Sequence, residues 1–456
     1  MGRSLSRNDI IGGNIWRQLL TLFYPIMLGM FFQQLYNTVD AVIVGNFVGK
    51  EALAAVGGST SHLINLLVNF FTGLSSGATV VISQYYGGDQ RQDTAEAVHT
   101  AFALALAGGA GIMLIGLFGS KAALTAMGVP DDVMVYALTY IRVYFCGMIP
   151  AMIYNMGSGI LRAVGDTKRP FYFLMAAALT NIVLDLLFVV VFHLSVFGVG
   201  LATTLSQLLS AVLTLRCFLR TPEVYRLSLK KIRFHMAKFR NIILIGFPAG
   251  LQSTMYSISN ITIQGTINSF GTNYMAAWTA FGKTDSLFWL GMNAIGISIT
   301  TFMGQNFGAR RYDRLKQGFR IGTAITTAIT LLITGLIYFG CGIILRLFTS
   351  DPEVLALGMR ISHFLPLTYV TYIAVEVCSA SIRGTGESLR PMLITCGGIC
   401  VFRVLWILLV TPHFHDFFVV IASYPISWLL TSVIFLIYYY KGHWLQKRIS
   451  LQSAAS

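Results

Sequence analysis

The sequence predicts an all-α integral membrane protein with twelve transmembrane helices arranged as two pseudo-symmetric six-helix bundles. Three observations support this fold class. Hydrophobic residues make up 55% of the 456 residues and charged residues only 11%, whereas about a quarter of the residues in a soluble domain are charged. Long apolar runs recur along the whole chain, and the two halves of the chain repeat one another.

Each apolar run is long enough to cross a bilayer as a helix, which takes about 20 residues. The polar first twenty residues lack the apolar core and cleavage site of a signal peptide, so we expect the first run to remain in the membrane. The expected helices cover residues 15–44, 53–83, 95–118, 133–160, 171–192 and 197–219 in the first half, and 241–268, 274–304, 319–347, 354–381, 391–411 and 416–440 in the second.

The net charge of +14 reflects membrane topology rather than a nucleic-acid partner. Most Lys and Arg residues lie in the tails and in alternate loops, which the positive-inside rule assigns to the cytoplasm. We therefore expect a multi-pass protein of the plasma membrane with both termini in the cytoplasm. The exceptions are Lys50, Lys121 and Arg346 on the other side, and Arg142, Lys283, Arg360 and Arg403 within the apolar runs.

The internal repeat is clearest in two loops. Residues 161–170 read L-R-A-V-G-D-T-K-R-P and residues 382–391 read I-R-G-T-G-E-S-L-R-P, an offset of 221. Pro25 and Pro248 match at an offset of 223. Six helices per repeat preserve the orientation, so the repeats should be related by an axis along the membrane normal. We expect an amino-terminal six-helix lobe at 1–219, a basic cytoplasmic linker at 220–240, and a carboxy-terminal lobe with a short tail at 241–456.

The polar residues with the strongest functional signal lie in the first and fifth apolar runs. Asp40 lies deep in the first run, where a carboxylate costs roughly 2.5–3.5 kcal/mol to insert and normally faces a cavity or a partner. Gln33, Asn37 and Asp40 are spaced by four and three residues, which places them on one helix face. Asn181 and Asp185 lie one turn apart in the fifth run. Two acids and their neighbouring amides indicate a cation site.

Several motifs resemble those of the multidrug and toxic compound extrusion (MATE) antiporters. They are the repeated loop above, the run G-Q-N-F-G-A at 304–309, the segment L-Y-N-T-V-D-A that ends just after Asp40, and N-I-V-L-D at 181–185. The resemblance covers nearly the whole chain. It implies twelve helices in two bundles and export of organic, often cationic compounds, coupled to inward flow of Na⁺ or H⁺.

The cation site that this resemblance implies consists of Asp40, Asn181, Asp185 and Thr203. Carboxylate, amide and hydroxyl oxygens are the ligands that hard cations prefer, so Na⁺ could bind there. Two neighbouring acids could carry a proton instead. A hydrogen-bond network that fixes helix packing is the alternative interpretation. The second half lacks these ligands, because Ile263, Phe402 and Trp406 stand at the corresponding positions.

Other polar residues are candidates for lining a substrate cavity. The second run carries a polar stripe that either lines this cavity or packs against another helix. Glu376 could attract a cationic substrate, or it could pair with Lys283 or Arg403; Lys283 and Asp285 could also neutralise one another. The candidate cavity residues are Gln33, Asn37, His62, Asn65, Asn69 and Glu376.

We therefore expect an antiporter that exports small organic cations or amphipathic drugs by alternating access, works as a monomer in lipid, and needs no cofactor besides its coupling ion. A lipid-linked oligosaccharide flippase of the same superfamily is the alternative. An intramembrane enzyme is disfavoured, since the chain shows no Ser/His/Asp set, no His-Glu-x-x-His and no phosphate-binding loop.

Overall fold

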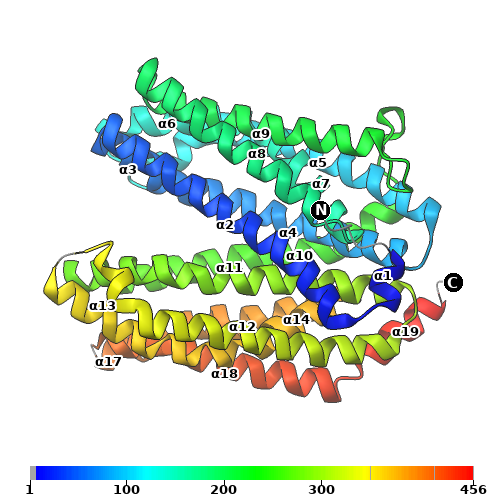
Figure 1. Cartoon of the computed structure of the whole chain (residues 1–456). Coiled ribbons are helices and arrows are strands. Elements are labelled where there is room, and N and C mark those ends of the chain that lie inside the picture. The colour runs from blue at the N-terminus through cyan, green and yellow to red at the C-terminus, as the bar shows by residue number, and fades with distance from the viewer. Residues whose placement is uncertain (1–6, 350, 415, 455–456) are drawn as a thin grey trace. The chain divides into compact units, whose positions relative to one another are not determined.

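The computed structural model describes residues 7–349, 351–414 and 416–454, apart from the side chains of residues 7, 8, 50, 51, 54, 59, 62 and 454 (Figure 1). Every element within these residues is helical. The elements up to the linker are α1 (Arg7–Gly12), α2 (Ile15–Phe47), α3 (Lys50–Gly57), α4 (Ser59–Gly87), α5 (Arg91–Ala126), α6 (Asp131–Cys146), α7 (Met148–Ala163), α8 (Lys168–Asp185), the π-helical turn η1 (Leu186–Val191) and α9 (Ser195–Arg220).

The second half has the same kinds of element. The linker contains the short 3₁₀ turn η2 (Leu229–Lys231). The helices that follow are α10 (Met236–Asn268), α11 (Thr272–Gly308), α12 (Tyr312–Arg346), α13 (Pro352–Phe364), η3 (Pro366–Tyr372), α14 (Ile373–Gly384), α15 (Leu389–Thr395), the π-helical η4 (Cys396–Val401), α16 (Phe402–Leu409), α17 (Thr411–Phe414), α18 (Phe417–Lys441) and α19 (Trp444–Ala454).

The predicted all-α membrane fold is confirmed. In the described residues, eleven spans are long and apolar enough to cross a membrane, and α6 with α7 makes a twelfth if the bent pair is one span. The expected helix over 133–160 is thus broken, with a 50° bend between Cys146 and Met148. Thr204 donates a hydrogen bond to the carbonyl of Val143 over 2.9 Å, which satisfies a backbone group next to the break.

The chain forms two compact units that exchange the starts of two helices. Unit 1 contains Tyr24–Gly250, and unit 2 contains Asn8–Phe23 together with the chain from Leu251 onward. The first part of α2 therefore belongs to unit 2, and the first part of α10 belongs to unit 1. The crossings lie next to Pro25 and Pro248, inside the two helices. These boundaries differ from the ranges 1–219 and 241–456 expected from the repeat, because the repeat says nothing about packing partners.

Unit 1 has one continuous apolar core, drawn from α2 to α9 and from the start of α10, including Ile242 and Ile245. Gly73 and Gly77 of α4 meet Gly250 and Gly246 of α10 backbone to backbone, so closely that a Cβ on any of the four would collide with the facing helix. Small residues at four-residue spacing allow such close approach between membrane helices. This contact holds the start of α10 in unit 1.

The repeated loops have the same structure in both units. Gly165 and Gly386 adopt φ angles of +90° and +89°, a conformation that favours glycine, so both loops make the same tight turn. Four residues after each glycine, an arginine pairs with the acid three residues before it. Both ion pairs, Arg169 with Asp166 and Arg390 with Glu387, measure 3.1 Å.

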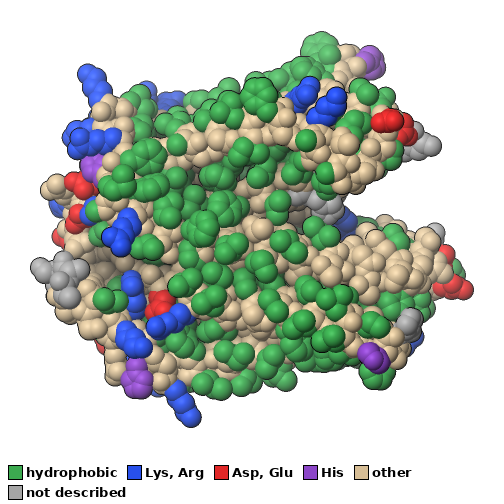
Figure 2. Space-filling view, turned by 180° about the vertical axis from the view of Figure 1, so that it is seen from behind, with side chains coloured by type: hydrophobic (Ala, Val, Ile, Leu, Met, Phe, Trp, Pro, Cys, Tyr) green, Lys and Arg blue, Asp and Glu red, His purple; other side chains and the backbone are tan. Residues whose placement is uncertain are grey.

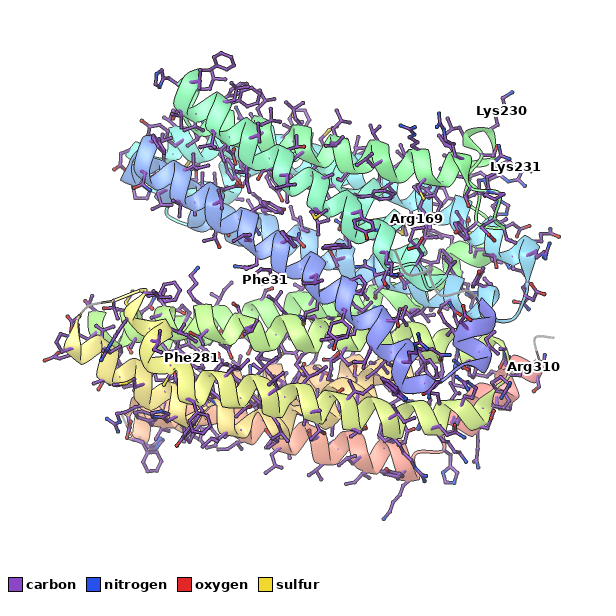
Figure 3. All side chains as sticks on the ribbon, in the orientation of Figure 1. Phe31, Arg169, Lys230, Lys231, Phe281 and Arg310 are labelled. Carbon is purple, nitrogen blue, oxygen red and sulfur yellow. The ribbon has the colours of Figure 1, made fainter. Side chains whose placement is uncertain are left out.

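The basic linker is partly packed rather than fully solvated. Leu227 is buried, and its backbone N–H donates to the carbonyl of Phe218 over 3.0 Å. The N–H of Ser228 donates to Nε2 of the buried His99 over 3.1 Å. These contacts attach the linker to α5 and α9 of unit 1, while Lys230 and Lys231 project outward (Figure 3).

The surface is that of a membrane protein. Phe118, Phe339 and Ile343 are 81%, 86% and 75% exposed, which would be unfavourable in water but suits a lipid-facing side chain. Figure 2 shows that hydrophobic side chains dominate the sides of both units, whereas Lys and Arg gather mainly near the helix ends. This distribution agrees with helices that cross a bilayer.

Candidate cation and substrate site

Two acids from different helices meet inside unit 1. Asp40 lies on α2 and Asp185 ends α8, and both are buried, at 7% and 0% exposure. Their carboxyl groups lie within electrostatic range of one another. The sequence predicted the two acids separately, and the fold brings them together. The π-helical turn η1 begins immediately after Asp185, and such turns often occur at functional sites in helices.

The buried polar atoms of this cluster lack protein partners. In the described part of the chain, no hydrogen bond reaches Oδ1 of Asp40, either carboxyl oxygen of Asp185, or either polar side-chain atom of Asn181. Such buried groups are normally satisfied, because leaving one without a partner costs about 1–3 kcal/mol or more. Carboxylate and amide oxygens suit a hard monovalent cation. Asp40, Asp185 and Asn181 therefore fit either a cation such as Na⁺ or a shared proton.

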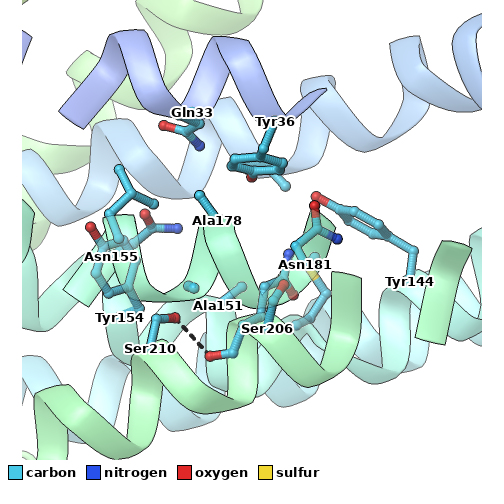
Figure 4. Close-up of a pocket in the computed structure, with 15 residues that line it drawn as sticks. Gln33, Tyr36, Tyr144, Ala151, Tyr154, Asn155, Ala178, Asn181, Ser206 and Ser210 are labelled. Atoms are coloured by element: carbon cyan, nitrogen blue, oxygen red, sulfur yellow. Dashed lines mark hydrogen bonds between the residues drawn. The ribbon is translucent and has the colours of Figure 1, made fainter. Parts of the chain in front are cut away.

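A pocket lies beside the acids, entirely within unit 1 (Figure 4). It encloses about 80 Å³, which is smaller than the roughly 300–1,000 Å³ of usual ligand pockets. This volume accommodates a hydrated ion or the cationic end of a larger compound. The lining comes from α2, α4, α6, α7, α8 and α9. Its polar members are Gln33, Tyr36, Tyr144, Tyr154, Asn155, Asn181, Ser206, Gln207 and Ser210.

Asn181 connects the pocket to the acids. It lines the pocket and lies one helical turn before Asp185 on α8. In Figure 4, Gln33 and Tyr36 extend from α2 toward the pocket, and Asn181 faces them from α8. A ligand in the pocket and an ion at the acid pair would therefore share one amide side chain.

Sequence reasoning missed the tyrosines of this site. Tyr36 interacts with Gln33 and with Asp40, and Tyr140 and Tyr144 of α6 lie within electrostatic range of Asp40. The spacing contained a signal for Tyr36, which lies three residues after Gln33 and four before Asp40. Tyr140 and Tyr144 had no such signal, because their position depends on how α6 packs in the bundle.

Thr203 lies on α9, which packs against α8. Its buried hydroxyl donates to the carbonyl of Val199 over 3.0 Å. Within the described residues, no interaction joins it to Asp40 or Asp185. Its oxygen keeps lone pairs that could bind a cation, so its membership of the site stays a prediction.

Three of the other cavity candidates do not line this pocket. Asn37, Asn65 and Asn69 are exposed and do not line it. The α4 residue that reaches the pocket is the apolar Val68. The side chain of His62 lies outside the described residues.

The remaining candidate, Glu376, lies in unit 2. It accepts a hydrogen bond from the hydroxyl of Tyr372 over 3.4 Å, and Gly296 faces it so closely that a Cβ there would collide with the carboxylate. Among the described residues, no ion pair links Glu376 to Lys283 or Arg403. Lys283 is exposed, and among the described residues it forms no ion pair with Asp285, the second acid of this unit.

That second acid, Asp285, is held by aromatic side chains. It accepts hydrogen bonds from the indole of Trp289 over 2.9 Å and from the hydroxyl of Tyr369. Arg403 is 2% exposed, lies 4.0 Å from the ring centre of Tyr424, and donates to Ser427 over 3.0 Å. Glu376 and Asp285 thus accept hydrogen bonds from protein donors, whereas no donor among the described residues reaches Oδ1 of Asp40 or either carboxyl oxygen of Asp185. No group of three or more His, Cys, Asp or Glu side chains suited to a metal ion occurs in the described residues.

Comparison with known proteins places this geometry in context. The family model described as MatE matches the chain twice, over residues 25–187 and 248–409, and the two matches begin at Pro25 and Pro248. The probable multidrug resistance protein YoeA of Bacillus subtilis is 28% identical, over 96% of each chain. The probable multidrug resistance protein NorM of Thermotoga maritima is 23% identical, over 95% of this chain and 94% of the relative.

Solved structures share the fold. A crystal structure described as MATE in the bent conformation superposes with a TM-score of 0.89 at 21% identity and covers 99% of both chains. A MOP superfamily transporter from Pyrococcus furiosus, described as having a binding pocket of reverse polarity, gives the same TM-score and identity and covers 99% of this chain and 100% of that one. At this identity, the likeness establishes the architecture.

Proposed function

Because the chain belongs to the MatE family of multidrug efflux transporters, we propose that it exports small amphipathic organic cations in exchange for Na⁺ or H⁺. It is a multi-pass membrane transporter, and its relatives are transporters rather than enzymes. The observation that supports the coupling is the pair of buried acids, Asp40 and Asp185, beside a polar pocket with which they share Asn181.

The proposed coupling follows from charge. Two ionised carboxylates in a low-dielectric interior need a counter-charge, because buried unpaired charges are costly. A cation or proton at Asp40 and Asp185 and the cationic end of a substrate in the adjoining pocket can each supply it. Once one of these ligands has neutralised the carboxylates, the other gains less binding free energy from them, so the two ligands compete. Competition of this kind lets one gradient drive the other when the transporter exposes the site alternately to the two sides.

The pocket size and lining define the proposed substrate class. Three tyrosines line the pocket, and tyrosine rings attract cations through their π faces. The enclosed volume of about 80 Å³ admits the cationic end of a compound. None of the described Lys and Arg side chains lines this pocket, so an anionic pyrophosphate would lack a counter-charge there. For that reason we do not favour the flippase alternative.

The orientation rests on the distribution of charge. The linker, the tails and the alternate loops together carry most of the basic residues, which supports cytoplasmic termini and a place in the plasma membrane. We propose that the transporter works as a monomer, since both acids and the whole pocket lie in one unit of a single chain.

The test is uptake of a fluorescent organic cation into proteoliposomes under separately imposed Na⁺ and pH gradients. We expect one of the two gradients to drive accumulation. For one-to-one exchange, a tenfold ion gradient supports up to about a tenfold substrate gradient, because each tenfold ratio is worth about 1.4 kcal/mol. Ionophores that collapse the gradient are the control. Equal uptake with and without either gradient would disprove ion coupling.

A further inference from the structure

The starts of α2 and α10 are each held by the unit that contains the other repeat. Residues Asn8–Phe23 belong to unit 2, and α10 up to Gly250 belongs to unit 1. These two segments are the only described parts of the chain that cross in this way. Besides its helix packing, each segment is held by a small set of polar side chains, which we call an anchor.

The unit 2 anchor centres on Arg314 at the start of α12. Its guanidinium donates to the carbonyl of Gly13 over 2.8 Å, to Oε1 of Gln18 over 3.2 Å and to Oδ1 of Asn306 over 3.0 Å. The amide of Asn306 also donates to the carbonyl of Ile10 over 3.4 Å. Arg314, Asn306 and Gln18 are 7%, 0% and 3% exposed. Because the donor of the first three hydrogen bonds is the charged guanidinium, and because the groups are shielded from solvent, these bonds should be strong.

The unit 1 anchor centres on Asp93 at the start of α5. Asp93 forms an ion pair with Lys238 of α10, and the Lys238 ammonium lies 4.5 Å from the ring centre of Tyr85. The amide of Asn241 donates to the hydroxyl of Tyr85 over 3.1 Å. The side chains of Lys238 and Asp93 are 12% and 38% exposed, so this anchor is partly open to solvent and weaker than that of unit 2.

The two anchors occupy the same positions of the repeat. Tyr85 and Asp93 correspond to Asn306 and Arg314 at the offset of 221. Of the residues that they hold, Gln18 and Asn241 correspond, because each lies seven residues before the proline of its helix, whereas Lys238 corresponds to Ile15. The chemistry differs, with an acid at one position and a base at its counterpart, yet the same helix segment is held. The same positions of the repeat thus hold the same helix segment through different pairings, which supports a shared mechanical role.

We propose that Arg314 and the Asp93–Lys238 pair are positioning residues for transport, which fix the starts of α2 and α10 to the opposite unit. Asp40 lies farther along α2, in unit 1. A helix held in unit 2 by its first turns and carrying the cation site in unit 1 transmits any change at Asp40 to unit 2. Without the anchor, the start of α2 would move independently of unit 2, and a change at Asp40 would not reach that unit. The proposal rests on the transport function proposed above.

The first experiment reverses charges in the partly exposed unit 1 anchor, where folding should survive. Asp93→Lys and Lys238→Asp each place like charges together and should each lower gradient-driven efflux about threefold to fivefold, the factor expected of a partly exposed ion pair. The double variant Asp93→Lys with Lys238→Asp restores attraction and should return at least half of the wild-type rate. Single variants as active as wild type, or a double variant without recovery, would overturn the role of this pair.

The second experiment compares two arginines of unit 2. Arg314→Met removes the buried anchor and should lower gradient-driven efflux at least about tenfold, since each hydrogen bond from a charged group is strong. Arg448→Met is the matched control, because Arg448 also donates to a backbone carbonyl of unit 2, that of Thr385, over 3.0 Å but does not touch α2. The control should transport within about twofold of wild type.

A distance measurement separates positioning from general damage. Spin labels at Trp16→Cys on α2 and Lys316→Cys on α12 report whether the start of α2 stays attached to unit 2; both positions are exposed. The distance distribution should broaden with Arg314→Met and stay narrow with Arg448→Met. A narrow distribution in Arg314→Met would overturn the proposal. If wild type moves no cation under either gradient, the proposed function fails, whereas the distances still show whether Arg314 anchors α2.

Discussion

Replacing Asp185 with Asn should abolish gradient-driven efflux while leaving a folded protein. Asn keeps the shape of the side chain but removes one of the two charges at the acid pair, so a cation loses its counter-charge and a proton loses an acceptor. We expect at least about a 100-fold loss, equivalent to about 2.7 kcal/mol. Asp40→Asn should behave in the same way. Folding should survive because a neutral amide costs less to bury than a carboxylate.

The measurement is efflux of the fluorescent cation at matched protein amounts in proteoliposomes. Asp132→Asn is the control, because it also removes a carboxylate of unit 1 but lies exposed at the start of α6. It should transport like wild type. Full gradient-driven efflux in both Asp40→Asn and Asp185→Asn would show that the acid pair is structural and that the coupling ion binds elsewhere.

Replacing Gly77 with Val should prevent unit 1 from packing correctly. A Cβ at Gly77 already collides with the backbone of Gly246 and with the carbonyl of Ile242, and backbone cannot move aside as a flexible side chain can. Overpacking typically costs about 1–3 kcal/mol, and we expect at least the upper end here. Thermal unfolding in detergent, followed by size-exclusion chromatography with fluorescence detection, should show a midpoint lowered by at least about 6 °C.

Gly111→Ala is the matched control for Gly77→Val. Gly111 lies inside α5, and nothing lies within 4 Å of a Cβ built there. Alanine stabilises a helix interior relative to glycine by up to about 1 kcal/mol, so this variant should unfold at the same temperature or slightly higher. If Gly77→Val unfolded at the wild-type temperature, α4 and α10 would not be in backbone contact.

Much of the cation site was predictable because its signals are local. Asp40 is costly in a long apolar run, and Asn181 and Asp185 lie one turn apart on one helix. These facts follow from helix geometry and from the cost of burying charge. The pocket was less predictable. Tyr144 and Gln207 reach it from helices distant in sequence, and Asn37 is exposed although it shares the spacing of Asp40.

The partners of the acids in unit 2 were also hard to predict from the sequence. The sequence left open whether Glu376 and Asp285 pair with Lys283 or Arg403. The fold instead gives them hydroxyl and indole donors, from Tyr372 to Glu376 and from Tyr369 and Trp289 to Asp285. Tyr372 and Trp289 lie four residues from their acids, a spacing that places each pair on one helix face. No spacing rule identifies Tyr369, because it lies far from Asp285 in the chain and meets it only when α11 packs against the later helices.

The helical membrane fold, the internal repeat and the buried acids of the first repeat could be read from the sequence alone. Hydrophobicity, periodicity and the cost of buried charge act over one helix or one turn, so they are readable in order along the chain. Only the tertiary structure decided that the starts of α2 and α10 cross to the other unit and that Arg314 and Asp93 hold them. Those choices depend on contacts between residues hundreds of positions apart, whose free energies exist only once the helices have packed.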